Sequence, residues 1–160
     1  MHPRNHLALL STVSLVVAMA LGSKPLSAAA SNDSALASVQ FRSYEAARAE
    51  SARTRRPILL VFSNPHCGPC KALEHAAFEN PIGLRLVNTA YVPVRFTLKI
   101  GDRDHVRETK EARSAANRLN IVGVPQVRVV SPDERVIGHF SWTTQSDVFW
   151  NLRRLSAALP

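Results

Sequence analysis

The spacing of apolar residues changes several times along the chain and predicts strands that alternate with helices. Residues 58–62 (Ile-Leu-Leu-Val-Phe) form a short continuous apolar run bounded by turn residues, which is typical of a strand buried on both faces. Two further apolar runs, residues 91–98 and 126–130, predict two more strands. A Ser-Pro-Asp-Glu turn sequence then leads to a strand at residues 135–140, so the last two strands form a hairpin.

Helices are predicted where strong helix formers dominate or where apolar residues recur at helical spacing. Val148, Leu152 and Leu155 place apolar side chains on one face of the last helix. The predicted helices span residues 43–55, 67–79, 82–88, 108–119 and 144–157. The first strands are joined by a helical crossover and the last two by a tight turn. We therefore expect an α/β fold with a mixed central β-sheet flanked by helices on both faces.

The first thirty residues have the pattern of a targeting segment. A short basic start, residues 1–6, precedes a fifteen-residue apolar run at residues 7–21, and small residues follow. This is the pattern of a cleaved secretory signal peptide; a retained membrane anchor, which needs about 20 apolar residues, is the alternative. We therefore expect a periplasmic protein with a signal peptide at residues 1–30, a leader at residues 31–42 and a domain at residues 43–160.

Composition narrows the class of protein further. The chain has 160 residues, a net charge of +8 and 46% apolar residues, which fits one soluble globular domain. It has only two cysteines, Cys67 and Cys70. In an exported protein these thiols meet an oxidising environment, and a disulfide that closes so short a loop contributes little stability. The pair therefore indicates chemistry rather than a structural bridge.

The motif Cys67-Gly68-Pro69-Cys70 follows the buried strand and opens a predicted helix. Unpaired N–H groups and a partial positive charge at a helix N-terminus stabilise a thiolate at Cys67. Pro69 is tolerated in the first turn because no hydrogen bond is lost there. Cys70 lies one turn further on, close enough to attack a mixed disulfide at Cys67. The motif thus predicts thiol–disulfide exchange, with the Cys67–Cys70 disulfide as the redox group and no separate cofactor.

Two segments carry a resemblance to a known family. Residues 62–71 (FSNPHCGPCK) resemble the active-site segment of thioredoxin-family proteins, and Gly-Val-Pro at residues 123–125, before an apolar strand, resembles their cis-proline loop. The order of elements over residues 43–155 is also similar. With Phe-Glu-Asn-Pro at residues 78–81, the chain looks most like exported thioredoxin-like domains related to the C-terminal domain of the thiol:disulfide interchange protein DsbD.

The resemblance implies a thioredoxin-like fold and a role for each residue of these segments. Cys67 would be the attacking cysteine and Cys70 the buried resolving one. Pro125 would be a cis-proline that holds the backbone of Val124, so that Val124 pairs with an extended substrate segment. The residues expected to support the active site are His66, Gly68 and Pro69.

The sequence departs from the thioredoxin pattern at two positions. His66 stands where thioredoxins usually have Trp; it either adds positive charge beside the attacking cysteine or is a solvated loop residue at the rim. Val61 stands where thioredoxins carry a buried Asp, which is thought to take the proton of the resolving cysteine. The candidates for that proton are then water and the carboxylates of Glu74 and Glu79.

The Gly-Pro dipeptide between the cysteines resembles that of reducing members of the family. We therefore expect an exported thiol–disulfide oxidoreductase that reduces disulfides of substrate proteins. A reductase outside the cytoplasm needs an electron source, so a membrane thiol-transfer protein is the expected reductant. We expect a monomer. The alternatives are a disulfide oxidase or isomerase, and a non-catalytic thioredoxin-like module for binding or metal delivery.

Other features are better explained without a ligand. The potential metal ligands near the motif are His66, Cys67, Cys70 and His75. They do not share one helix face, so no metal site is predicted. Arginines within residues 53–56 predict a solvated helix end rather than a nucleic-acid site, because no aromatic residues are interleaved to stack on bases. Trp142 and Trp150 are predicted to pack in the fold.

Overall fold

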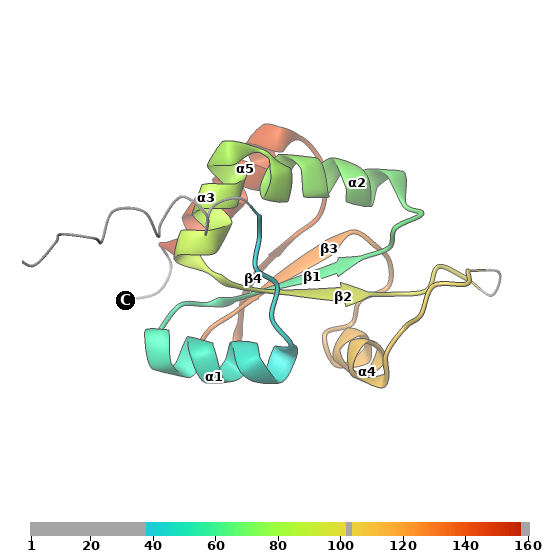
Figure 1. Cartoon of the computed structure of the whole chain (residues 1–160), viewed down its shortest axis with the longest axis horizontal. Helices are drawn as coiled ribbons and strands as arrows, with labels where there is room; N and C mark the ends of the chain where they lie inside the picture. Colours follow the sequence, from blue (N-terminus) through green and yellow to red (C-terminus); the bar gives the residue numbers. More distant parts are fainter. Residues whose placement is uncertain (1–37, 102–103, 158–160) are drawn as a thin grey trace, which may run out of the picture. The chain divides into compact units, whose positions relative to one another are not determined.

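The computed structural model describes residues 38–101 and 104–157 (Figure 1). The expected signal peptide, residues 1–30, and the first part of the expected leader lie outside the described residues. Within the described ranges, no helix is long and apolar enough to cross a membrane.

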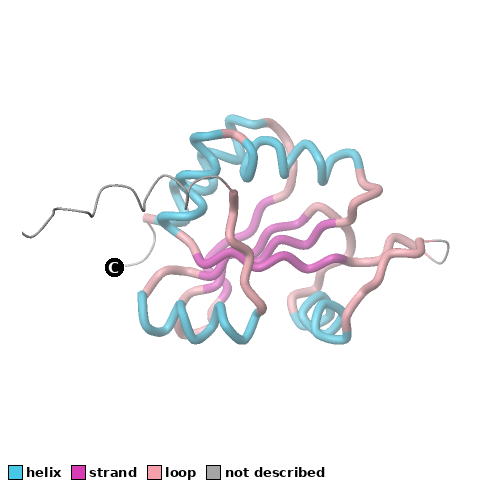
Figure 2. The backbone as a smooth tube through the Cα atoms, viewed as in Figure 1, coloured by secondary structure: helices cyan, strands magenta, loops and turns pink. Residues whose placement is uncertain are grey.

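The centre of the fold is a four-stranded mixed sheet, drawn in magenta in Figure 2. Its strand order is β2-β1-β3-β4. Strand β1 pairs in parallel with β2, whereas β3 is antiparallel to both β1 and β4. The helical crossover after β1 and the tight turn after β3 explain these directions. The strands are β1 (Ile58–Ser63), β2 (Val92–Thr97), β3 (Gln126–Val130) and β4 (Val136–Phe140). The predicted mixed sheet and hairpin are confirmed.

Helices cover both faces of this sheet, as predicted. Helices α1 and α4 lie against one face, and α2, α3 and α5 lie against the other (Figure 1). Their bounds are α1 (Tyr44–Thr54), α2 (Gly68–Glu74), α3 (Pro81–Ala90), α4 (Lys110–Arg118) and α5 (Gln145–Ser156). Hydroxyl or amide side chains cap four of them by accepting a backbone N–H; these caps are Ser43, Asn80, Thr109 and Thr144.

Strand β1 is apolar throughout because both of its faces are covered. Leu59 and Val61 pack under α2, α3 and α5, while Leu60 and Phe62 pack under α1 and α4. All six residues of the strand are buried. This central strand therefore anchors the cysteine motif, which follows it directly, to two hydrophobic clusters.

The helix predicted over residues 67–79 is not one regular helix, so that prediction is wrong in one respect. Helix α2 ends at Glu74 and continues as a π-helical turn, η2 (His75–Glu79), closed by a bond from the Asn80 N–H to the His75 carbonyl. Gly83 of α3 packs so closely on this turn that a Cβ would lie 2.6 Å from the Ala76 carbonyl oxygen. This packing, which residue spacing does not reveal, accompanies the change of helix type.

The segment before α1 is part of the packed fold. Val39 and Phe41 precede the expected domain start at Ser43, yet both pack against the cluster on the α2 side of the sheet. The N–H of Arg42 donates to the carbonyl of Pro93 at the start of β2. The packed fold thus includes residues that precede α1.

The two tryptophans have different surroundings. Trp142 is partly buried against the core, as predicted. Trp150 is 61% exposed, with the guanidinium of Arg154 4.8 Å from its ring centroid, so the prediction that it packs is wrong. Val148 and Leu152 face the sheet, and Trp150, midway between them on α5, therefore faces away from it.

Candidate redox-active site

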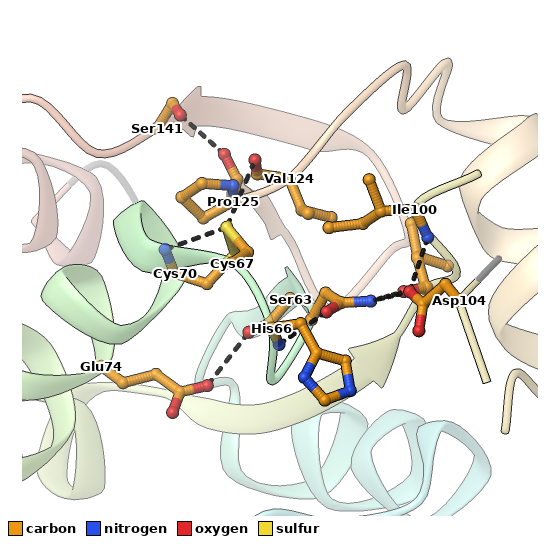
Figure 3. The surroundings of a disulfide bond; sticks show 12 residues. Ser63, His66, Cys67, Cys70, Glu74, Ile100, Asp104, Val124, Pro125 and Ser141 are labelled. Carbon is orange, nitrogen blue, oxygen red and sulfur yellow. Dashed lines mark hydrogen bonds between the residues drawn. A yellow bond between two sulfur atoms is a disulfide. The ribbon is translucent and has the colours of Figure 1, made fainter. Parts of the chain in front are cut away.

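The two cysteines lie where the chain leaves β1 and enters α2 (Figure 3). Cys67 is the N-cap of α2, and its sulfur accepts a hydrogen bond from the backbone N–H of Cys70 at 3.1 Å. The two residues form a disulfide with a Cα–Cα distance of 5.2 Å, which is in the ordinary range. The Cys67 sulfur therefore sits at the positive end of α2.

The two sulfurs differ in access to solvent. Cys67 is 9% exposed and Cys70 is 1% exposed. The neighbours of Cys67, namely His66, Gly68 and Pro69, are all exposed. An incoming thiol or disulfide can reach Cys67 along the surface, whereas Cys70 is enclosed by the fold. This difference fits Cys67 as the attacking cysteine and Cys70 as the resolving one.

The loop before β3 faces the disulfide across a short gap. The Val124–Pro125 peptide bond is cis. The carbonyl oxygen of Val124 lies 3.8 Å from the Cys67 sulfur, and the Ser141 hydroxyl donates to the Pro125 carbonyl at 2.6 Å (Figure 3). The hairpin strand β4, which ends beside Ser141, thus fixes the loop against the cysteine motif.

A buried asparagine fixes the turn that precedes Cys67. Asn64 is 1% exposed, and its side-chain oxygen accepts the His66 N–H at 2.7 Å. Its amide nitrogen donates to the Leu98 carbonyl and to the Asp104 carboxylate. Asn64 therefore joins the cysteine loop to the chain that follows β2. The sequence marks Ser-Asn-Pro only as a loop, although Asn before such a turn often bonds the N–H two residues on.

Asp104 holds the loop after β2 beside His66. Its carboxylate accepts the backbone N–H of Ile100 at 2.8 Å and that of Val106 at 3.0 Å. These bonds, Ile100 first, together with the Asn64 amide and the nearby His66, keep the pKa of the Asp104 carboxyl below its ordinary value. Sequence reasoning missed Asp104, because nothing in residues 99–107 indicates contact with the active-site turn.

His66 lies at the rim of the site. Its side chain is exposed, and in the described part of the chain its ring makes no hydrogen bond. In Figure 3 the ring is directed away from the Cys67 sulfur. It faces a hollow of about 380 Å³ that it lines with Asn64, Ile100, Asp104 and His105. Of the two interpretations given above, this placement favours a solvated rim residue.

The two candidate carboxylates for the Cys70 proton are placed differently. Glu74 accepts a hydrogen bond from the Ser63 hydroxyl at 3.0 Å and follows Cys70 by four residues, so both lie on one helix face. Glu79 is 66% exposed in its side chain and pairs with His75. Val61 is fully buried. Of the two carboxylates, Glu74 is therefore the one on the Cys70 face of α2.

The potential metal ligands named in the sequence analysis do not form a metal site in the described part of the chain. Among residues 38–101 and 104–157, no group of three or more His, Cys, Asp or Glu side chains is arranged to hold a metal ion. Cys67 and Cys70 are joined to each other, and His75 bonds Glu79.

Comparison with known proteins places this geometry in a wider group. A family profile described as thioredoxin-like matches residues 39–132. The DsbH oxidoreductase is similar in structure, with a TM-score of 0.66 at 14% identity over 79% of this chain and 90% of that one. A thioredoxin from Thermus thermophilus has a TM-score of 0.61 at 19% identity, over 73% and 86% of the two chains.

The C-terminal domain of DsbD from Neisseria meningitidis, in its oxidised form, is also similar. Its TM-score is 0.50 at 16% identity, over 72% of this chain and 98% of that domain. A comparison with curated proteins gives no match. At these identities the structural similarity demonstrates a common thioredoxin-like fold, which includes the DsbD-type domains that the sequence resembles.

The depressed pKa of Asp104 predicts a pH-dependent contribution to stability. The ionised carboxylate bonds best, so its contribution is present above the unfolded pKa, about 4, and is lost as pH falls through the lower folded pKa. We expect Asp104→Asn to be less stable than wild type at pH 7 and the difference to shrink in acid. Urea unfolding across this range measures it; a difference that is independent of pH contradicts the assignment.

Proposed function

We propose that this chain, which belongs to the thioredoxin-like family, is an exported thiol–disulfide oxidoreductase that reduces disulfides of other proteins. The observation that carries the proposal is the Cys67–Cys70 disulfide at the start of α2, with Cys67 more exposed and facing Val124. The direction rests on the Gly-Pro dipeptide between the cysteines, which resembles that of reducing members of the family.

The chemistry proceeds in two exchange steps. In the reduced protein, the Cys67 thiolate attacks a substrate disulfide, so that a mixed disulfide forms and one substrate thiolate leaves. Cys70 then loses its proton and attacks the Cys67 sulfur, which releases the second substrate thiolate and forms the Cys67–Cys70 disulfide. Two electrons pass to the substrate. The N–H of Cys70 and the positive end of α2 favour the thiolate at Cys67.

The cis-proline loop is proposed to hold the substrate during attack. The Val124 carbonyl lies beside the Cys67 sulfur, and Ser141 secures the Pro125 carbonyl from the other side. An extended substrate segment that pairs with the Val124 backbone would place its own cysteine next to Cys67. Main-chain pairing requires no particular side chain, which suits an enzyme that acts on several proteins.

The reaction needs a supply of electrons outside the cytoplasm. We propose that a membrane thiol-transfer protein reduces the Cys67–Cys70 disulfide by the same exchange chemistry in reverse, so no bound cofactor takes part. The signal-peptide pattern of residues 1–30 supports export, and hence this kind of partner.

Glu74 is the proposed acceptor of the Cys70 proton. It lies on the Cys70 face of α2 and is partly buried, and the hydroxyl of the buried Ser63 donates to its carboxylate. Arg95 lies 3.6 Å from the same carboxylate oxygen. A carboxylate supplied from α2 would thus replace the one that thioredoxins supply from β1, where this chain has Val61.

Removing the resolving cysteine should trap substrates. We expect Cys70→Ala to accumulate mixed disulfides through Cys67, because the second exchange step is then blocked. Expression with the native leader, alkylation, and mass spectrometry of non-reducing gel bands identify the linked cysteine.

Cys67→Ala is the matched control for this experiment and should trap no partner. Trapping by Cys67→Ala alone would mean that the two roles are reversed. Trapping by neither variant, together with no insulin reduction by the wild type, would instead favour a non-catalytic module.

Glu74→Gln should slow the resolution of a mixed disulfide. The amide still accepts the Ser63 hydrogen bond but takes no proton, so we expect Cys70 to attack at least about tenfold more slowly near neutral pH. The measurement is the decay rate of a preformed Cys67–glutathione disulfide as a function of pH. Glu79→Gln, which removes an exposed carboxylate from the same helical segment, should leave the rate unchanged. Equal rates in wild type and Glu74→Gln would exclude Glu74.

A further inference from the structure

A second hollow begins at the cis-proline loop. It encloses about 330 Å³ between the segment that leads into β3 and the end of β4. Val124, whose carbonyl faces the Cys67 sulfur, lines one part of it. Arg128 of β3 and His139 of β4 line another part. The hollow therefore extends from the loop that faces Cys67 to a cationic position on the sheet.

Strand register places the two basic residues side by side. Arg128 and His139 are direct partners in the β3–β4 ladder, so their side chains project from the same face. Val127 and Val129 point to the opposite face, into the core under α5. The alternation of β3 thus turns Arg128 away from the core on the α2 side and toward the hollow.

The charge of Arg128 is not balanced by a carboxylate. Its guanidinium donates to the Gln126 side-chain oxygen at 2.7 Å and to the Val127 carbonyl at 3.3 Å. Within the described part of the chain, no acidic side chain lies at ion-pair distance from it. Some other arginines of the described residues do have such partners, namely Arg42, Arg48, Arg56, Arg95, Arg113 and Arg135, whereas the remaining ones, like Arg128, do not.

Arg128 is also partly removed from water. The side chain is half-buried, and this burial lowers the pKa of its guanidinium, although it stays protonated at neutral pH. A partly desolvated cation that bonds only neutral oxygens leaves donor capacity for an anion. A carboxylate suits the planar guanidinium best, because it accepts two parallel N–H groups.

We propose that Arg128, assisted by His139, binds the carboxylate of an acidic residue in the extended polypeptide that pairs with Val124. This inference deepens the proposed function and rests on it. Arg128 follows Val124 by four residues, and an extended chain advances about 3.3 Å per residue, so a carboxylate roughly two to four residues from the reacting cysteine can approach Arg128. Val122, which is 87% exposed at the same hollow, offers an apolar contact to the residue between them. The preferred partners are therefore proteins with acidic residues close to the reacting cysteine.

Short activated peptides test this subsite directly. Each peptide carries one cysteine as a 2-pyridyl disulfide and is blocked at both ends, so that only side chains are charged. The Cys67 thiolate of the reduced protein attacks the peptide sulfur and expels 2-thiopyridone; Cys70 then displaces the peptide thiol and closes the disulfide. Stopped-flow absorbance gives the second-order rate constant of the first step. Glu, Gln or Lys is placed two, three or four residues from the cysteine, on either side.

We expect Glu to react about three- to tenfold faster than Gln at one of these positions, and Lys to react more slowly than Gln. The preference should weaken as salt is added, because the pair is partly exposed. Arg128→Gln should abolish the ratio of Glu to Gln rates, Arg128→Lys should keep part of it, and His139→Gln should lower it less. If Arg128→Lys keeps part of the Glu preference and Arg128→Gln does not, the loss in Arg128→Gln is due to the missing charge and not to a disturbed structure.

The matched control is Arg135→Gln, which makes the same charge change at an exposed hairpin residue paired with Asp133. It should leave the ratio intact. The subsite is contradicted if wild type reacts fast but shows no preference for Glu, if the preference survives Arg128→Gln, or if Arg135→Gln removes it equally. Failure of the proposed function would give a different result. Every peptide would then react with the protein no faster than with dithiothreitol at the same thiol concentration, whatever residue it carries.

Discussion

The step from β1 into α2 is the constraint on which the rest of the site depends. Strand β1 is buried on both faces, so its last residue fixes where the chain emerges from the sheet. Cys67 is the N-cap of the helix that follows, which places its sulfur against the N–H groups of the first turn. Cys70, one turn later, is buried by the same geometry. Unequal exposure of the two sulfurs therefore follows from how a strand and a helix are joined.

Side chains from distant segments keep this junction in place. Asn64 ties the turn to the chain after β2, and Asp104 holds that chain through backbone N–H groups. On the other side, Ser141 at the end of β4 holds the cis-proline loop. None of these contacts involves a cysteine, but together they hold the segments on both sides of the cysteine motif. The two charged residues given roles in the proposals, Glu74 on α2 and Arg128 on β3, also lie outside the cysteine motif.

The parts of the fold that depend on residues close together in the sequence can be predicted from it. The apolar run of β1, the Cys-x-x-Cys spacing and the hairpin turn each act over a few residues. Contacts between segments that are far apart in the sequence cannot be predicted in this way. The sequence indicates only that Asn64 lies in a turn and that Arg128 is a polar residue in a strand. The π-helical turn η2 accompanies the close approach of Gly83 from another helix, which no local periodicity encodes. Trp150 faces away from the sheet although its residue type favours burial.

The direction of electron flow is the central claim that most needs a direct measurement. The reduction potential of the Cys67–Cys70 pair is obtained by equilibrating the protein with glutathione or dithiothreitol buffers and counting free thiols by mass spectrometry. A protein-disulfide reductase of this type should have a potential near that of thioredoxin, about −270 mV. A potential near about −120 mV, typical of a strong oxidant whose reduced form is the stable one, would contradict the account.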